Sequence, residues 1–245
     1  MRKMSISTYS TILSVWITQC FLVFCSCNIN AQALSLQLVE TSTPPLLDVP
    51  TYSLATQGTL SLSDDNEQKS TSTTAMNILT YATPVSIRPD RIWSIGLYKG
   101  TTTHENFVTQ KEGVLQLLKP EHAPIVKLLG GSSSREVDKA EGCKRLGFRW
   151  ISKEMNVIVG NLGGVGKDNT MPCDLLPNCA CYLKLSLVGE LIDCGSHDVA
   201  LCKVESISVA TEGSQIDGLE PDREYLNTAL LREMKIITDQ GRVAE

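Results

Sequence analysis

The chain has 245 residues, of which 42% are apolar, and a formal net charge of −5 at pH 7. This composition is typical of a folded, soluble protein and excludes wholesale disorder. Basic and acidic residues are interspersed without a basic stripe, which argues against a nucleic-acid partner, because nucleic-acid phosphates require clustered Lys and Arg.

The first 33 residues differ from the rest of the chain. Arg2 and Lys3 precede an uncharged stretch over 12–27, and Asn-Ala-Gln-Ala follows at 30–33. A basic start, an apolar core and a small-residue exit predict a secretory signal peptide over 1–33. A membrane anchor is the alternative, since the apolar stretch has about the minimum length for a span. No later stretch is long and apolar enough to cross a bilayer, so we expect no stable span once the signal is removed.

Entry into the secretory pathway leaves two destinations open, export and a complex plastid. Residues 34–46 contain Pro44 and Pro45 and little periodicity, so they are interpreted as a leader between the signal and the folded domain.

Removal of the signal peptide leaves six of the nine cysteines, namely Cys143, Cys173, Cys179, Cys181, Cys194 and Cys202. In an oxidising compartment they could form disulfides, with Cys173 joined to Cys179 or Cys181 around a short loop. The alternative is buried free thiols that pack as small hydrophobes, which we favour for Cys194 and Cys202 because both lie in apolar strand sequence.

The remainder of the chain contains six stretches with strand-like patterns and four with helical spacing. The expected strands are 49–56, 76–87, 92–98, 113–118, 179–190 and 198–210. The expected helices are 104–110, 124–129, 136–146 and 221–235. Residues 61–74 are expected to form a solvated loop, and 156–170 a flexible Gly-rich loop. Many strands with turn signals and few helices predict a closed antiparallel barrel.

Local signals refine these elements. Ser133 or Ser134 is a possible N-cap of the 136–146 helix, and Gly147 is its stop. The last two long strands are expected to join in a hairpin-like turn around Gly195. The 221–235 helix would carry one apolar stripe of four residues. These are Leu226, Ala229, Leu230 and Met234.

Residues 99–106 have the composition of an anion-binding loop. Gly100 lets the backbone approach a ligand closely, and Thr101 to Thr103 supply hydroxyl and amide donors at the end of a strand. A helix that begins near Thr103 would point its partially positive end at the same place. The loop therefore predicts a site for a phosphate-bearing cofactor, although a polar turn with Thr as cap residue has the same composition.

Three segments together resemble the flavin reductase-like family of FMN-binding split-barrel proteins. They are 77–107, Gly-Ser-Ser-Ser-Arg-Glu-Val-Asp-Lys at 131–139, which is similar to the Ser-Gly-Arg-x-x-Asp-Lys element of that family, and 195–204, which is similar to its Gly-Asp-His strand. The resemblance covers about residues 47–240. It implies a mainly β fold, a six-stranded antiparallel Greek-key split barrel with a few peripheral helices, and a homodimer with FMN near the subunit interface.

The resemblance also implies a cofactor site. Thr80, Thr83 and Ser86 would contact the ribityl chain and the edge of the isoalloxazine, and the phosphate would be surrounded by Lys99, Gly100, Thr101, Thr103 and Asn106. Tyr81 and Ala82 stand where family members often carry Ser or Asn, which is a departure from the pattern. Ser134 and Arg135 would contribute from a helix start, where Arg135 could reach a phosphate or a carboxylate or remain solvated. Asp138 and Lys139 are interpreted as a surface pair.

Of the three histidines, His197 has the strongest case for function. It lies in a turn between two strands, where a lone histidine is often a surface residue. The resemblance implies instead that His197 faces the cofactor and helps to seat or protonate the nicotinamide-side substrate. His104, near the phosphate loop, and His122, in a loop near Pro124, have weaker cases.

Several other site classes are excluded by their motifs. Five residues separate Gly160 from Gly166 where a P-loop has four, and Asp168 replaces the Ser or Thr that holds magnesium. The cysteines lack paired zinc-site spacing, so no metal site is expected. No Gly-x-Ser-x-Gly motif for a serine hydrolase occurs.

The expected function is that of a flavin reductase in which NAD(P)H delivers hydride to N5 of FMN and the reduced flavin passes electrons onward. Two alternatives stay open. One is a non-catalytic FMN-binding module that does not turn over a nicotinamide nucleotide. The other is a secreted, disulfide-stabilised barrel that binds no flavin.

Overall fold

The computed structural model describes residues 46–58, 74–155, 171–209 and 224–244, all within the unit Leu46–Glu245. The predicted signal peptide and all of the leader except Leu46 lie outside the described residues. The Gly-rich stretch 156–170 and most of the polar loop 61–74 lie outside them as well. Of the helices that are described, none has the length and apolar character needed to cross a membrane.

Eight described strands form one sheet, and every pair of neighbours in it is antiparallel. Their order is β2-β1-β5-β6-β8-β4-β3, with β7 beside β8. The strands are β1 (Tyr52–Gln57), β2 (Thr74–Leu79), β3 (Ala82–Ser86), β4 (Ile92–Tyr98), β5 (Glu112–Leu117), β6 (Cys181–Leu187), β7 (Ile192–Cys194) and β8 (His197–Ser208).

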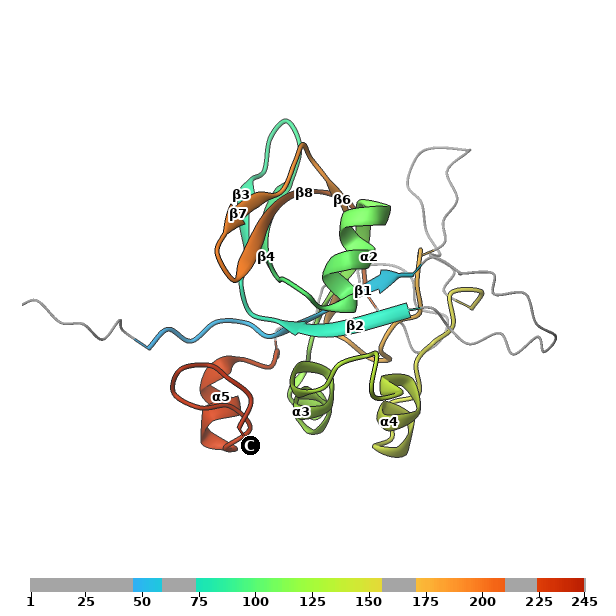
Figure 1. Ribbon diagram of the computed structural model, residues 1–245, viewed down its shortest axis with the longest axis vertical. Coiled ribbons are helices and arrows are strands. Elements are labelled where there is room, and N and C mark those ends of the chain that lie inside the picture. Colours follow the sequence, from blue (N-terminus) through green and yellow to red (C-terminus); the bar gives the residue numbers. More distant parts are fainter. Residues whose placement is uncertain (1–45, 59–73, 156–170, 210–223, 245) are drawn as a thin grey trace, which may run out of the picture. The chain divides into compact units, whose positions relative to one another are not determined.

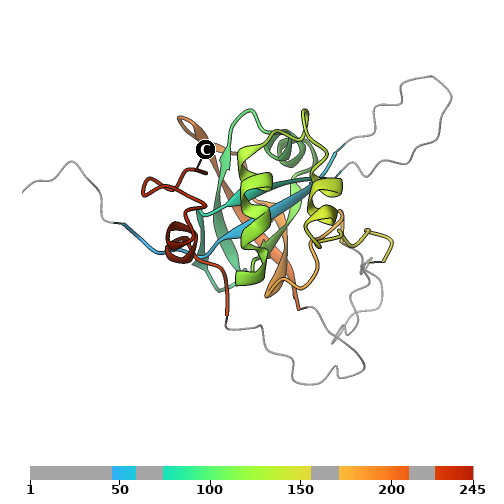
Figure 2. The ribbon, with the colours of Figure 1, turned by 90° about the horizontal axis from the view of Figure 1, so that it is seen from below.

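The described helical segments number five and are short. They are α2 (Thr102–Gln110), the 3-10 turn η1 (Pro120–His122), α3 (Ala123–Gly131), α4 (Lys139–Arg145) and α5 (Thr228–Glu233). In Figure 1, α2 lies on the side of β1 and β2 toward which the other strands curl, and α3 and α4 lie on the opposite side. Figure 2 shows α3 lying across β1 and β2.

The central strands are buried on both faces because two cores use alternate residues. Leu54 and Leu115 belong to the core inside the curled sheet, which Phe107 of α2 completes. Their chain neighbours Ala55 and Val114 belong to a second core that α3 fills. Successive strand residues point to opposite faces, so one strand can serve both cores. Each fully buried Leu or Phe contributes about 1.5–3 kcal/mol relative to an exposed side chain.

The predicted single strand 76–87 is wrong, since two strands stand there. β2 pairs with β1 and β3 pairs with β4, so the two lie at opposite ends of the strand order. The chain crosses between these two sheet edges at Thr80 and Tyr81, where the carbonyl of Tyr81 accepts a bond of 2.8 Å from the Gly96 N–H. A Cβ on Gly96 would stand 3.0 Å from the Tyr81 Cβ, so glycine permits this close crossing.

The remaining predictions are confirmed in part. Strand 92–98 has the predicted bounds, and α2 begins two residues before the predicted 104–110. β7 was not predicted, and the hairpin turn at Gly195 joins it to β8 rather than joining the two long strands. The mainly β split-barrel class is confirmed, with eight described strands in place of six.

Two helix predictions need correction. α4 begins at Lys139 and is capped by Asp138, whose carboxylate accepts a bond from the Glu141 N–H, so neither Ser133 nor Ser134 is the cap. α5 is shorter than the predicted 221–235, of which 221–223 lie outside the described residues. Its buried face includes Leu231, and the predicted stripe residue Met234 is exposed.

Candidate ligand-binding groove

A groove of about 850 Å³ opens beside the N-terminus of α2. The ends of β2 and β4, the β7–β8 turn and Lys139 of α4 line it, together with four loop or helix-end segments. These segments are 80–81, 100–104, 130–134 and 240–243. The volume lies within the range of about 300–1,000 Å³ that is usual for small-molecule sites.

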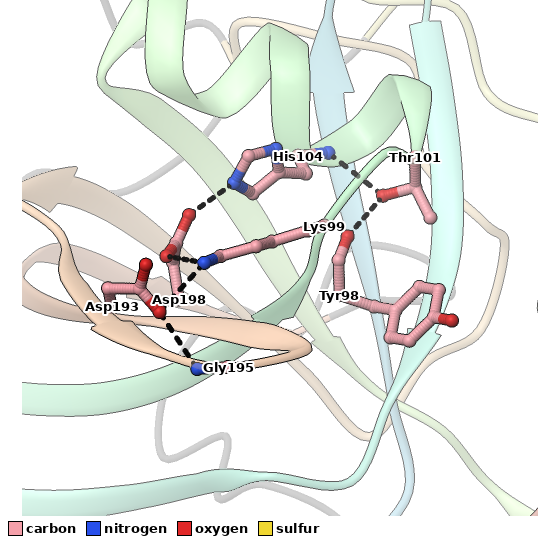
Figure 3. A network of polar contacts seen from close by, with 7 residues as sticks. All are labelled: Tyr98, Lys99, Thr101, His104, Asp193, Gly195 and Asp198. Carbon is pink, nitrogen blue, oxygen red and sulfur yellow. Dashed lines mark hydrogen bonds and ion pairs between the residues drawn. The ribbon is translucent and has the colours of Figure 1, made fainter.

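The first turn of α2 presents unpaired donors to this groove. Thr101 is the N-cap, and its Oγ1 accepts a bond of 3.2 Å from the His104 N–H and donates one of 3.0 Å to the Tyr98 carbonyl (Figure 3). The first backbone bond of the helix runs from the Glu105 N–H to the Thr101 carbonyl. Among the described residues, no backbone acceptor is found for the N–H groups of Thr102 and Thr103. Thr102 Oγ1 is buried and also lacks a partner. A ligand oxygen would satisfy these donors.

Gly100 and Phe107 fix the position of this turn. Gly100 has a φ of +77°, which favours glycine, and a Cβ there would meet nothing within 4 Å. Phe107 is fully buried and anchors the helix in the inner core. The donors at the helix start are therefore held on a rigid element beside open space.

Lys99 forms an ion-pair network at the end of β4. Its Nζ lies 2.9 Å from a carboxylate oxygen of Asp193 and 3.2 Å from one of Asp198. The other oxygen of Asp198 lies 2.8 Å from His104 Nε2 (Figure 3). The hydrogen bond from His104, together with that from Lys99, lowers the pKa of Asp198. Asp193 and Asp198 raise the pKa of Lys99. Two carboxylates thus offset the charge of this lysine.

Lys139 is a groove residue whose environment was predicted wrongly. Rather than forming a surface pair with Asp138, it is 5% exposed, and its ammonium donates to the carbonyls of Met76 at 2.9 Å and Leu129 at 2.6 Å. Burial lowers the pKa of Lys139 to about 8. The sequence signal was present in the Asp-Lys element at 138–139, but burial depends on how α4 packs against β2 and α3.

His197 stands at the start of β8 between two aromatic rings. The rings of Tyr81 and Tyr98 approach it edge-on, with centroids 5.5 and 5.2 Å away. Its Nδ1 is 3.0 Å from Ser196 Oγ. These contacts hold the imidazole at the groove in a defined orientation.

The predicted site residues divide into two sets. Six line the groove: Thr80, Gly100, Thr101, Thr103, Ser134 and His197. Five do not: Thr83, Ser86, Lys99, Asn106 and Arg135.

The residues outside the groove have other contacts or surroundings. Thr83 is exposed on β3, and Ser86 donates to the Arg88 carbonyl. Arg135 pairs with Glu105 of α2, with an Nη2 to Oε2 distance of 2.6 Å. Asn106 Nδ2 is buried and has no hydrogen-bond partner within the described parts of the chain.

The other two histidines differ in setting. His104 lines the groove and is bound to Asp198. His122 is buried outside the groove, where its Nδ1 accepts from the Lys119 N–H at 3.1 Å and its Nε2 donates to the Pro177 carbonyl at 2.9 Å. Desolvation lowers the pKa of His122. This histidine is therefore a neutral structural residue.

The six cysteines of the described residues are free thiols in the structure. Five are buried, and burial raises the pKa of four of them to well above the physiological range, namely Cys173, Cys179, Cys181 and Cys202. Cys202 packs in the inner core as predicted, whereas Cys194 is exposed on β7.

Comparison with solved structures supports the fold assignment. Flavoredoxin from Methanosarcina acetivorans aligns with a TM-score of 0.51 and 14% identity over 77% of this chain and 82% of that chain. An FMN-binding protein from Thermus thermophilus, solved with bound 1-cyclohex-2-enone, has a TM-score of 0.48 and 14% identity over 85% and 86%. The NADH:FAD oxidoreductase SgcE6 from Streptomyces globisporus aligns with a TM-score of 0.47 and 12% identity over 67% of this chain and 77% of that chain.

Of these three structures, flavoredoxin is the one that aligns with a TM-score above 0.5, so the fold assignment rests on it. It confirms the resemblance at the level of the fold, which is that of the flavin reductase-like split barrel. No protein-family model and no curated protein sequence matches this chain.

Proposed function

We propose that the groove binds FMN and that the protein is an oxidoreductase of the flavin reductase kind, with NAD(P)H as the electron donor. The observation that carries the proposal is the set of unpaired donors at the start of α2, which open into a groove on a split-barrel scaffold. Sequence resemblance in three segments points to the same cofactor.

The residues at the helix start fit a phosphate group. The N–H groups of Thr102 and Thr103 and the hydroxyl of Thr102 lack partners, and the helix dipole favours an anion there. Gly100 carries no side chain that would obstruct the approach. Lys139 adds a positive charge to the same groove below about pH 8.

Thr80 and His197 are proposed to face the ring system. Thr80 lies where the chain crosses between the sheet edges, and His197 is held by Ser196, Tyr81 and Tyr98. Bound FMN would supply a hydride acceptor at its N5 position. With its Nδ1 accepting from the Ser196 hydroxyl, His197 would hold or donate a proton at its Nε2.

The second candidate function is an FMN-binding module that does not turn over a nicotinamide nucleotide. Lys99, which does not line the groove, is paired with two carboxylates and so adds little charge for binding a second anionic nucleotide. The test is oxidation of NADH and of NADPH at 340 nm by the purified protein with added FMN. Turnover above that of free FMN supports the oxidoreductase, whereas bound flavin without turnover supports the module.

We also propose a homodimer that covers the open side of β3. This strand pairs with β4 alone among the described strands. Val85 on the strand and Ile87, directly after it, are 58% and 74% accessible. The neighbouring groove residues Tyr81 and Tyr98 are also exposed, so the apolar surface continues into the site. Light scattering after gel filtration should give a dimer mass, and Ile87→Glu should give a monomer.

Entry into the secretory pathway through a signal peptide over 1–33 remains our proposal for localisation. N-terminal sequencing of the protein recovered from its native host would identify a new terminus close to residue 34 if the signal is cleaved there.

A further inference from the structure

Arg242 is the one cation lining the groove whose side chain has no protein partner among the described residues. Lys139 is bound to two backbone carbonyls. Lys99 and Arg135, the cations expected from the sequence, pair with carboxylates and do not line the groove. An unpaired guanidinium at a groove is suited to bidentate contact with a phosphate.

A hairpin over 236–244 holds Arg242 at the groove. Its backbone bonds run from the Thr238 N–H to the Arg242 carbonyl at 2.7 Å and from the Ala244 N–H to the Ile236 carbonyl at 2.9 Å. Gly241 has a φ of +76° at the turn, and the Arg242 N–H donates to Thr238 Oγ1 at 3.3 Å. The position of the arginine backbone is therefore set by local bonds.

The hairpin is seated on the end of α3 through two glycines. A Cβ on Gly130 or on Gly131 would stand 3.2 Å from a methyl group of Val243, so glycine permits this contact without displacement of the valine. Ile237 and Val243 pair across the hairpin in an antiparallel bridge. The segment thus forms a fixed wall of the groove beside the 130–134 segment.

We propose that Arg242 binds the phosphate monoester of a nucleotide held in the groove, and so determines specificity for phosphorylated ligands. This inference rests on the proposed function. Two nucleotides of the proposed reaction carry such a group, FMN at its 5′ position and NADPH at its 2′ position. Riboflavin and NADH are the matching ligands that lack it.

The test compares dissociation constants of the wild-type protein with those of Arg242→Gln for FMN, riboflavin, NADPH and NADH. Flavin fluorescence and protein fluorescence give these constants without turnover. We expect about a 5- to 30-fold loss for FMN or for NADPH and no change for the matching ligand that lacks the phosphate. If only FMN binding weakens, Arg242 contacts the 5′-phosphate of FMN, and if only NADPH binding weakens, it contacts the 2′-phosphate of NADPH. The loss should shrink as ionic strength rises, because Arg242 is exposed.

Two further variants make the result specific. Arg242→Lys keeps the charge but not the forked geometry, so its loss should be intermediate. Arg149→Gln removes an exposed arginine that does not line the groove and should leave all four constants unchanged.

Equal binding of all four ligands by wild type and Arg242→Gln, with FMN bound by both, overturns this inference and leaves the proposed function standing. If wild-type protein binds none of the four ligands, both proposals fail.

Discussion

His104 Nε2 lies 2.8 Å from Asp198 Oδ2, which ties the first turn of α2 to the start of β8. The same carboxylate accepts from Lys99, and each side chain of the His104–Asp198 pair is at most 15% exposed. An amide in place of this carboxylate would keep one acceptor oxygen but lose the other one and the negative charge, so one of the two donors would lose its acceptor.

Asp198→Asn should therefore lower the urea midpoint of unfolding. The matched control is Asp193→Asn, which removes the other carboxylate bound to Lys99 from a side chain that is 78% exposed. Solvent competes for that exposed ion pair, so we expect a smaller change. Equal midpoints for the two variants would contradict a structural role for the His104–Asp198 contact.

Thr102→Val separates the stability of the free protein from ligand affinity. The Thr102 hydroxyl is buried without a partner, so valine should leave the free energy of unfolding unchanged or raise it by up to about 1 kcal/mol. FMN affinity should fall about tenfold or more, because a hydrogen bond from the hydroxyl to the charged phosphate is lost. Chemical denaturation and fluorescence titration measure the two effects.

Thr109→Val provides the control for that substitution. Thr109 lies on the same helix, is exposed and donates to the Glu105 carbonyl, away from the groove. The Thr109→Val substitution should therefore leave FMN affinity unchanged. A Thr102→Val protein that is less stable than wild type and binds FMN equally well would refute the assigned role.

Lys139 predicts a pH dependence of flavin binding. Its pKa of about 8 in the free protein means that its charge is lost as pH rises through that value. A phosphate favours the charged form, so FMN affinity should be highest below pH 8 and fall between about pH 8 and 9.5. Riboflavin affinity should stay flat over this interval, in which the FMN phosphate, with a second pKa of about 6, does not titrate.

Lys139→Met should abolish the difference in pH dependence between FMN and riboflavin. Lys144→Met is its control, since Lys144 is an exposed α4 residue paired with Glu141. If FMN binding to Lys139→Met retains the wild-type pH profile, the lysine does not contact the phosphate.

His122 predicts loss of stability in mild acid. Its native pKa lies below 6.5, so the unfolded chain takes up a proton more readily than the folded protein. The stability it contributes is complete above about pH 6.5 and declines as pH falls from there toward the native pKa. His122→Gln should remove this part of the slope and cost about 1–3 kcal/mol at pH 7.5, because buried backbone groups lose partners. Urea unfolding from pH 5 to 8 measures both.

The local sequence pattern predicted correctly the bounds of strands that have turn residues at both ends. β4 follows a Pro-containing turn and precedes Gly100, so its bounds were predicted correctly. The sequence from β2 to β3 contains no Gly or Pro before Pro84, and both strands are rich in apolar and β-forming residues. The change of partner at Thr80 and Tyr81 is a property of the whole curled sheet, which a local pattern does not contain.

The predicted residues that lie together in the groove are mainly those at the start of α2. Gly100, Thr101 and Thr103 are neighbours in sequence, so a strand-exit pattern was enough to bring them together. The pairing of Lys99 with Asp198 depends on the register of β4 and β8, in which Leu97 faces Asp198. Burial of Lys139 and the approach of Arg242 depend on tertiary packing of α4 and of the 236–244 hairpin, for which the sequence gives no periodic signal.

Fluorescence titration of FMN with the purified wild-type protein tests the central proposal, that the α2 N-terminus and its groove hold a flavin phosphate. We expect saturable quenching of FMN, with riboflavin bound at least about tenfold more weakly because it has no phosphate to form charge-assisted hydrogen bonds. Unchanged FMN fluorescence at protein concentrations of about 100 μM, or equal affinity for FMN and riboflavin, would contradict it.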